Sequence, residues 1–472
     1  MKSSTPSLYR DDFILGLVES ELNETLYKSW GQSLARMLPV GSNILVTADF
    51  RQSSELFKTA LIEGLLSNGV NVFDSGNIPS NLASYGLDLV EGNACVSVTG
   101  SNHASIWNGL RWIIPESSFS IASQLKRLHD EANSPVVSGV NSGVTTTARG
   151  NYQTLDMIPP WYDLLQNVWY DVPQLPLRII LDPMYGNWAP LAQHALQTCF
   201  PKISFESIHD EPKGDFGGML PASRCRKSLS TLCSEVVRRH ADLGIALEAD
   251  ACSFSLIDNL GQPLLSEEVI WIVLHYLLSD TINGEIFLHD VNCSEKIITE
   301  GIRLGASPRV VKNSHHAFLK KMKETNALIG FGFDGSIYFR GVRGRRIVIF
   351  AICWFLDYFT RLKMPLSEWR KLFPKFYTTP EIRTPQVPLE DVVQRLSATW
   401  SCFPSSTLEG IRFVVPNGRI HIRIVSDFSQ LAFHFETDHQ SSLRRIFSQC
   451  CYALKDLDHL SFFLKEGLAN WM

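Results

Sequence analysis

The feature of this sequence that most constrains its fold is a repeated alternation of short apolar runs with helical patterns. In the first repeat, apolar runs lie at 43–49, 70–73 and 94–98, and a helical pattern at 55–66 stops before Gly69. Such alternation is typical of βαβ units. Because helices join the successive strands of these units, we expect a parallel sheet.

The same alternation recurs twice further along the chain. The second series has expected strands at 177–181, 203–208 and 243–247. The third series has expected strands at 285–290, 310–311 and 327–331, with helices at 267–278 and 317–323. Three such series predict three α/β domains.

The tail has a different pattern. From Pro380 onward, apolar and polar residues alternate with a period of two, which predicts strands at 410–415, 419–426 and 431–436. Asn417-Gly418 between the first two runs is a hairpin signal. An apolar-striped helix is expected at 442–454. The tail therefore reads as a smaller α+β domain.

These patterns predict an α/β protein with three βαβ-type domains of mixed or parallel sheets and a C-terminal α+β domain, around a central cleft. The expected domain boundaries are 1–155, 156–258, 259–375 and 376–472. The stretch between Asn133 and Tyr152 is rich in Ser, Asn, Gly and Thr, which is typical of a linker or a surface loop.

The composition is that of a soluble globular protein, with 45% hydrophobic and 19% charged residues. A net charge of −5 over 472 residues gives no electrostatic reason to bind nucleic acid or an anionic membrane. The longest apolar runs, at 269–278 and 347–356, are about half as long as a membrane span, so we expect buried helices. The chain opens without an export signal and its 10 cysteines form no Cys-x-x-Cys pair, which favours reduced thiols in the cytoplasm.

One loop is a candidate for chemistry. The apolar run at 94–98 breaks into Gly100-Ser101-Asn102, so a strand delivers a hydroxyl to a turn at the carboxyl edge of the expected sheet. Open α/β sheets place their chemistry at that edge. Two interpretations are open: Ser101 caps the structure that follows, or it is a functional hydroxyl.

The segment resembles the active-site loop of the α-D-phosphohexomutases, usually written T-A-S-H-N-P and followed by N-G-x-K. In that family the serine carries a phosphoryl group that passes to and from a sugar phosphate. The serine position here is Ser101, the next pair is inverted as Asn102-His103, and Asn108 to Arg111 is similar to N-G-x-K. The run 49–54 is also similar to the family motif G-R-D-T-R-x-S-S. The resemblance extends from about Tyr9 to Leu454, and the four-domain layout is also that of the family.

The resemblance implies a catalytic group of Ser101, His103, Arg111 and His316, the last matching a family histidine that precedes a helix. The family metal loop, D-G-D-x-D-R, falls on residues 248–253 and implies Mg²⁺ on Glu248, Asp250 and Cys252.

Three interpretations of this metal loop are open. A thiol at position 252 is a soft ligand that Mg²⁺ disfavours, so one alternative is a polar loop without a metal. The other is Zn²⁺ on Asp250, Cys252 and a histidine such as His103 or His316.

Two further loops implied by the resemblance recognise the substrate. The sugar loop, G-E-x-S-G-H, falls on residues 331–336 and places Asp334 and Ser336 where the substrate would lie, although Asp334-Gly335 also reads as a structural turn. The distal phosphate loop, R-P-S-G-T-E-P-K, falls on 424–431, where Ser426 keeps the serine and Asp427 sets a carboxylate toward the phosphate.

A basic run with Arg340, Arg343, Arg345 and Arg346 follows the sugar loop. It is either a solvated loop or a rebuilt anion site.

Two classes of function remain. One is a hexose 1-phosphate/6-phosphate mutase of the phosphomannomutase/phosphoglucomutase type whose activity is weak or lost, because four loops depart together from the family pattern. The other is a catalytically silent relative that binds a sugar phosphate or has a regulatory role. The expected partners are a hexose phosphate and possible protein partners, with no nucleic acid and no membrane, and the chain is expected to be a monomer or a weak dimer.

Overall fold

The computed structural model describes residues 8–10, 13–114, 121–133, 148–169, 175–223, 225–250, 252–279, 284–385, 387–402, 404–425, 430–457 and 460–469. These residues form two compact units. The first unit comprises 8–264 and 345–367, and the second comprises 265–344 and 368–472. Most of the linker expected between Asn133 and Tyr152 lies outside the described residues.

The first sheet of the first unit has six strands. In spatial order they are β1 (Phe13–Leu17), β5 (Trp107–Ile113), β4 (Ala94–Val98), β2 (Asn43–Ala48), β3 (Asn71–Asp74) and β6 (Tyr152–Thr154). Strands β4, β2, β3 and β6 are parallel to one another. Strand β5 is antiparallel to both of its neighbours, β4 and β1. Strands β2, β3 and β4, which correspond to the runs expected at 43–49, 70–73 and 94–98, are parallel, and the antiparallel strands β1 and β5 make the sheet mixed. Only residues 99–106 separate β4 from β5, which is too short for a crossover to a parallel strand.

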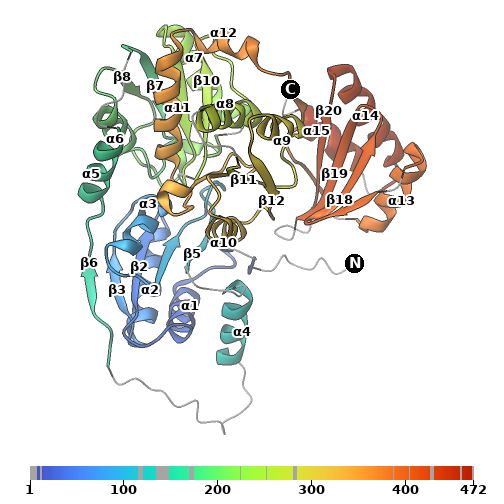
Figure 1. The fold of residues 1–472 in the computed structure, drawn as a ribbon. Helices are drawn as coiled ribbons and strands as arrows, with labels where there is room; N and C mark the ends of the chain where they lie inside the picture. The colour runs from blue at the N-terminus through green and yellow to red at the C-terminus, as the bar shows by residue number, and fades with distance from the viewer. Residues whose placement is uncertain are drawn as a thin grey trace. The chain divides into compact units, whose positions relative to one another are not determined.

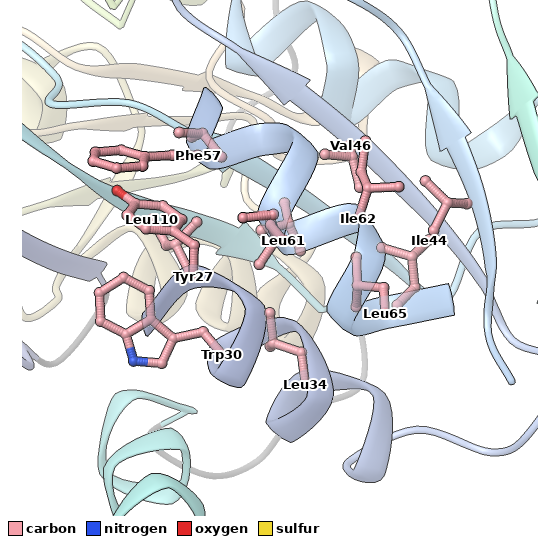
Figure 2. Close-up of a cluster of buried hydrophobic side chains, with 14 of the residues drawn as sticks. Tyr27, Trp30, Leu34, Ile44, Val46, Phe57, Leu61, Ile62, Leu65 and Leu110 are labelled. Carbon is pink, nitrogen blue, oxygen red and sulfur yellow. The ribbon is translucent and has the colours of Figure 1, made fainter. Parts of the chain in front are cut away.

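Two helices pack together beside this sheet, α1 (Glu24–Arg36) and α2 (Ser54–Leu66). Figure 2 shows Tyr27, Trp30 and Leu34 of α1 facing Leu61 and Leu65 of α2, and all five side chains are buried. Apolar residues spaced three and four apart form one face of each helix, so burying them joins the helices to the sheet.

Two glycines allow the close approach of α1 and α2. A Cβ at Gly31 would lie 2.3 Å from the carbonyl oxygen of Leu61, and a Cβ at Gly64 would lie 2.1 Å from that of Lys28. Real Cβ atoms do not approach a backbone oxygen so closely, so any larger residue forces the helices apart. Two further helices of the first unit lie in this stretch of the chain, α3 (Ser80–Tyr85) and α4 (Ile121–Asn133).

The second sheet of the first unit has the order β10 (Phe254–Asp258), β9 (Leu243–Leu247), β7 (Arg178–Asp182) and β8 (Ser204–Ser207). Strands β9, β7 and β8 are parallel and β10 is antiparallel to β9. Its helices are α5 (Ile158–Trp169), α6 (Ala192–Cys199) and α7 (Arg226–Arg238). The apolar helix α11 (Val348–Leu362) returns to this unit, where Phe350 packs on Trp169, with ring centroids 4.9 Å apart.

The second unit contains two sheets (Figure 1). The first has the order β12 (Ser307–Val310), β11 (Ile286–His289), β13 (Ile329–Phe331) and β14 (Ile337–Phe339), with β14 antiparallel to the parallel core. Its helices are α8 (Ser266–Ser279), α9 (Glu295–Arg303) and α10 (His315–Thr325). The short helix α12 (Leu366–Trp369) begins at the end of the first unit. Helices α8 and α11 confirm the two buried helices expected from the apolar runs.

The second sheet of this unit is wholly antiparallel, with the order β15 (Tyr377–Thr378), β20 (Gln430–Thr437), β19 (Gly418–Val425), β18 (Gly410–Val415) and β17 (Ser405–Thr407), and β16 (Ile382–Pro385) also pairs with β20. Its helices are α13 (Leu389–Trp400), α14 (Gln440–Ala453) and α15 (Leu460–Ala469). The expected hairpin at Asn417 is confirmed, with φ +63° at that residue.

The structure confirms a mixed α/β chain with several parallel-rich sheets, while the four domain boundaries stay a prediction. No helix in the described ranges is both long and apolar enough to cross a membrane.

The packing of α1 on α2 predicts a cost for filling Gly64. We expect Gly64→Ala to lower the free energy of unfolding by about 1–3 kcal/mol, because the new methyl group overlaps the Lys28 carbonyl. Gly341 is the matched control, since a Cβ there meets nothing within 4 Å. Urea denaturation of both variants is the measurement, and equal midpoints would contradict the packing argument.

Candidate functional site

A buried ion pair organises the loop that carries Ser101. Arg51 Nε lies 2.9 Å from Asp49 Oδ2, and the Arg51 side chain is fully buried. Its terminal nitrogens donate to four backbone carbonyl oxygens of the 99–107 segment, those of Ser101, His103, Ala104 and Trp107. The Arg51 guanidinium also lies 4.8 Å from the centroid of the Phe216 ring. One arginine thus fixes the path of the whole loop.

Asp49 holds the start of the same loop. Its Oδ2 accepts hydrogen bonds from Thr99 Oγ1 at 2.8 Å and from the Gly100 N–H at 3.2 Å. Its Oδ1 accepts from the Ser54 hydroxyl and from the Arg51 N–H. Because both carboxylate oxygens are satisfied, the buried charge is compensated.

Ser101 occupies a conformation that few non-glycine residues adopt. Its φ is +55°, in the left-handed region, and its N–H donates to Thr99 Oγ1 at 2.9 Å. Strain of this kind persists only where the surroundings impose it, and it concentrates at functional sites. The Arg51 and Asp49 contacts supply that constraint.

The Ser101 hydroxyl joins the two sheets of the first unit. Ser101 Oγ donates to Asp250 Oδ2 at 2.5 Å, and Asp250 follows β9 of the second sheet. Arg111 Nη2 donates to the same Oγ at 2.9 Å from β5 of the first sheet. The structure therefore brings together three residues that the sequence analysis selected: the Ser101 hydroxyl, the Asp250 carboxylate and the Arg111 guanidinium.

The charges around Asp250 keep it ionised. Burial raises the pKa of Asp250, but the positive charges of Arg111 and Arg346 and the hydrogen bond from Ser101 oppose burial, and the net shift is downward. An ionised Asp250 Oδ2 can accept the Ser101 proton.

The positions expected to bind a metal have other roles. Glu248 is buried and accepts a hydrogen bond from Ser223 Oγ at 3.3 Å. Burial raises the pKa of the Cys252 thiol to about 11, so it is protonated near neutral pH, and a protonated thiol is not a Mg²⁺ ligand. Within the described ranges no three His, Cys, Asp or Glu side chains are grouped so that they could hold a metal, which also leaves the Zn²⁺ alternative without a ligand set. The donor set does not fit Mg²⁺.

The other predicted site residues are placed as follows. The His103 ring stays within its own loop, with Nδ1 3.1 Å from the Gly100 carbonyl oxygen. His316, Asp334 and Ser336 belong to the second unit. Asp334 Oδ1 accepts from the Ser336 N–H at 3.0 Å, as expected for the structural turn. Ser426 lies outside the described residues.

Three residues that shape the site are absent from the predicted set. The signal for Asp49 and Arg51 was the similarity of the run 49–54 to a family motif, and the signal for Arg346 was the basic run.

The second unit holds a buried polar cluster that sequence analysis missed. Arg423 Nε and Nη2 donate to the two carboxylate oxygens of Glu381 at 2.6 and 2.7 Å. Asn292 Nδ2 donates to Glu381 at 3.0 Å, and Asn292 Oδ1 lies 2.6 Å from His421 Nδ1. Burial and the nearby Arg412 lower the pKa of His421 to about 4, so its ring is neutral. These contacts link the end of β11 to strand β19.

The Glu381–Arg423 pair gives a stability prediction. Burial opposes ionisation of Glu381, yet the bonds with Arg423 lower its pKa to about 2. Glu381→Gln should lower the free energy of unfolding by about 3–5 kcal/mol, because it leaves Arg423 buried without a counter-charge. Glu63→Gln removes the exposed pair with Arg149 and should cost at most about 1 kcal/mol. Chemical denaturation that gives equal losses for the two variants would refute this account of the cluster.

Comparison with known proteins identifies the family. Residues 10–134 match the family model "Phosphoglucomutase/phosphomannomutase, alpha/beta/alpha domain I", and residues 161–261 match the corresponding model for domain II. The phosphomannomutase/phosphoglucomutase of Pseudomonas aeruginosa is 25% identical over 466 residues, which cover 96% of each chain. A phosphomannomutase of Escherichia coli is 26% identical over 340 residues, 69% of this chain and 71% of the relative.

Solved structures agree on the fold. The crystal structure of a phosphoglucomutase/phosphomannomutase family protein from Burkholderia thailandensis superposes with a TM-score of 0.81 at 21% identity, covering 96% of this chain and 97% of that one. The phosphoglucomutase pp63/parafusin from Paramecium gives a TM-score of 0.70 at 14% identity, covering 98% and 96%. With two successive family models matched in order and relatives of this type aligned along nearly the whole chain, this protein belongs to the α-D-phosphohexomutase superfamily.

Proposed function

We propose that this protein accepts a phosphoryl group on Ser101 from a hexose bisphosphate and returns it to a hexose monophosphate, with slow overall mutase turnover. The observation that supports the proposal is the 2.5 Å hydrogen bond from Ser101 Oγ to Asp250, with Arg111 on the same oxygen. A hydroxyl with an ionised acceptor and a cation beside it is suited to nucleophilic attack on phosphorus.

The proposed step balances as follows. Ser101 Oγ attacks phosphorus, and its proton passes to Asp250 Oδ2. The bond between phosphorus and the sugar oxygen breaks, and the proton passes from Asp250 to that oxygen, which leaves as a hydroxyl. Arg111 donates toward the charge that develops on the phosphoryl oxygens. In the return step the free hydroxyl oxygen of a hexose monophosphate attacks the phosphoryl group on Ser101 and gives its proton to Asp250. The bond from phosphorus to Oγ breaks, and the proton passes from Asp250 to Oγ. The product is the hexose bisphosphate, and a new transfer to Ser101 from its other position completes the mutase cycle.

The loops that would hold the sugar support slow turnover. Asp334 is engaged within its own turn, and the position of the family glutamate in the sugar loop is Gly332. In the distal phosphate loop implied by the resemblance, the sequence has Asp427 in place of the family glycine, and a carboxylate there would repel a phosphate dianion. Loss of one positioned donor typically lowers a rate by about 10²–10³. The weakly held intermediate must reorient before the second transfer, so we expect that step to limit the cycle.

A second candidate function is a silent relative that binds a sugar phosphate without turnover. The observation that favours it is the unsuitable donor set at Glu248, Asp250 and Cys252. Phosphorylation of Ser101 separates the two candidates, because only the first one requires it.

The first prediction concerns the covalent state of Ser101. Incubation with glucose 1,6-bisphosphate should add one phosphoryl group that intact-mass and peptide-mass spectrometry assign to Ser101. Ser101→Ala should remain unmodified, and Ser105→Ala in the same loop is the matched control that should be phosphorylated normally. Wild-type protein that stays unmodified would favour the silent relative.

The second prediction concerns turnover. With glucose 1-phosphate or mannose 1-phosphate and the bisphosphate activator, a coupled assay should give a rate at least roughly 10²-fold below the ordinary enzyme range of about 1–10³ per second. A rate inside that range that disappears in Ser101→Ala would show that other groups hold the sugar and its distal phosphate.

A further inference from the structure

Two arginine side chains, Arg111 and Arg346, supply positive charge around Ser101 and Asp250. Arg111 contacts Ser101 Oγ at 2.9 Å, and its Nη1 lies 3.7 Å from Asp250 Oδ2. The positive charge of Arg346 acts to lower the pKa of both Asp250 and Cys252. All five residues belong to the first unit.

We propose that the guanidinium groups of Arg111 and Arg346 replace the divalent cation of phosphoryl transfer, so that the Ser101 site binds a phosphate dianion without a metal. The proposal rests on the proposed function for its substrate, a phosphoryl group at Ser101. The new claim concerns which positive charges neutralise the phosphoryl oxygens.

Arg111 is placed to serve a ligand. Its guanidinium lies 5.4 Å from the centroid of the Phe13 ring, which supports one face of the group. Its Nε is buried and has no hydrogen-bond partner among the described residues. The side chain is 28% exposed, which leaves the group accessible to an incoming anion. A buried donor without a partner is costly unless a ligand satisfies it.

The residues on either side of Arg346 have structural roles. Arg345, the preceding residue, forms a bidentate pair with Asp88 at 2.7 and 3.0 Å. The residue that follows Arg346 is the N-cap of helix α11. Arg340, earlier in the basic run, pairs with Glu285 in the second unit. Arg340 and Arg345 thus form ion pairs, while the charge of Arg346 acts on Asp250 and Cys252.

The charge at the site suits a phosphate dianion. Two guanidinium groups carry the same charge as one divalent cation, and the forked geometry of each matches two phosphate oxygens. Asp250 supplies one carboxylate, so the site keeps an excess of positive charge. Phosphoryl transfer depends chiefly on positioning and on neutralising the phosphoryl oxygens, which both groups provide.

The test is calorimetric titration of inorganic phosphate into the full-length protein in the presence of EDTA. We expect binding with the same affinity in EDTA and in excess Mg²⁺. Arg111→Gln and Arg346→Gln should each weaken binding by about 10- to 100-fold, the cost of losing one charged hydrogen bond. Arg149→Gln is the control and should bind normally, because Arg149 forms an exposed ion pair with Glu63 elsewhere.

Further variants keep the test decisive. Arg111→Lys retains the charge and should retain part of the affinity, and thermal melts verify that each variant is folded. Binding that requires Mg²⁺, or that neither glutamine variant weakens, overturns the proposal even if Ser101 is phosphorylated. Conversely, metal-independent binding that both variants weaken supports it even if Ser101 is never phosphorylated, so the two proposals fail separately.

Discussion

The buried ion pair of Asp49 and Arg51 is the interaction on which the candidate site depends. Removing two charges from water costs several kcal/mol per ion unless hydrogen bonds replace the lost hydration. Here the carboxylate accepts from Thr99, Gly100 and Ser54, and the guanidinium donates to four loop carbonyls. Asp49 and Arg51 have all these hydrogen-bond partners only when the 99–107 segment follows its observed path. The stability of the buried ion pair therefore depends on the backbone conformation that includes Ser101.

That linkage explains how a strained serine can persist. The left-handed backbone at Ser101 costs of order 1–3 kcal/mol, and the network around Arg51 offsets it. In this conformation the Ser101 hydroxyl donates to Asp250, which follows a strand of another sheet, and accepts from Arg111 of β5. Because β5 runs antiparallel to β4, Arg111 stands opposite Ser97, near the carboxyl end of the strand that precedes the Ser101 loop.

Sequence reasoning predicted the regular elements well because each carries a local signal. Strand β9 and the hairpin at Asn417 lie where the patterns placed them. Strand β5 was missed because Asn108-Gly109 reads as a loop. The structure gives Gly109 another role: a Cβ there would lie 1.8 Å from the Ile14 carbonyl oxygen, so glycine permits the close approach of β1.

The site was predicted in part, for a related reason. Ser101, Arg111 and Asp250 were selected through motif similarity, and the structure brings them together. Partners that are distant in the sequence have no local signal. The charge of Arg346 acts on Asp250, which lies nearly a hundred positions earlier in the chain. In the second unit, Glu381 likewise pairs with Arg423 of another strand. Charge pairs of this kind follow from tertiary packing, which a single sequence does not encode in any short pattern.

The most direct test of the central claim is a crystal structure of the protein soaked with glucose 1,6-bisphosphate. The account predicts a phosphoryl group on Ser101 Oγ with its oxygens bound by the Arg111 guanidinium, and Arg51 still bonded to the carbonyls of the 99–107 segment. An unmodified Ser101 turned away from Asp250, with the bisphosphate bound elsewhere, would contradict it.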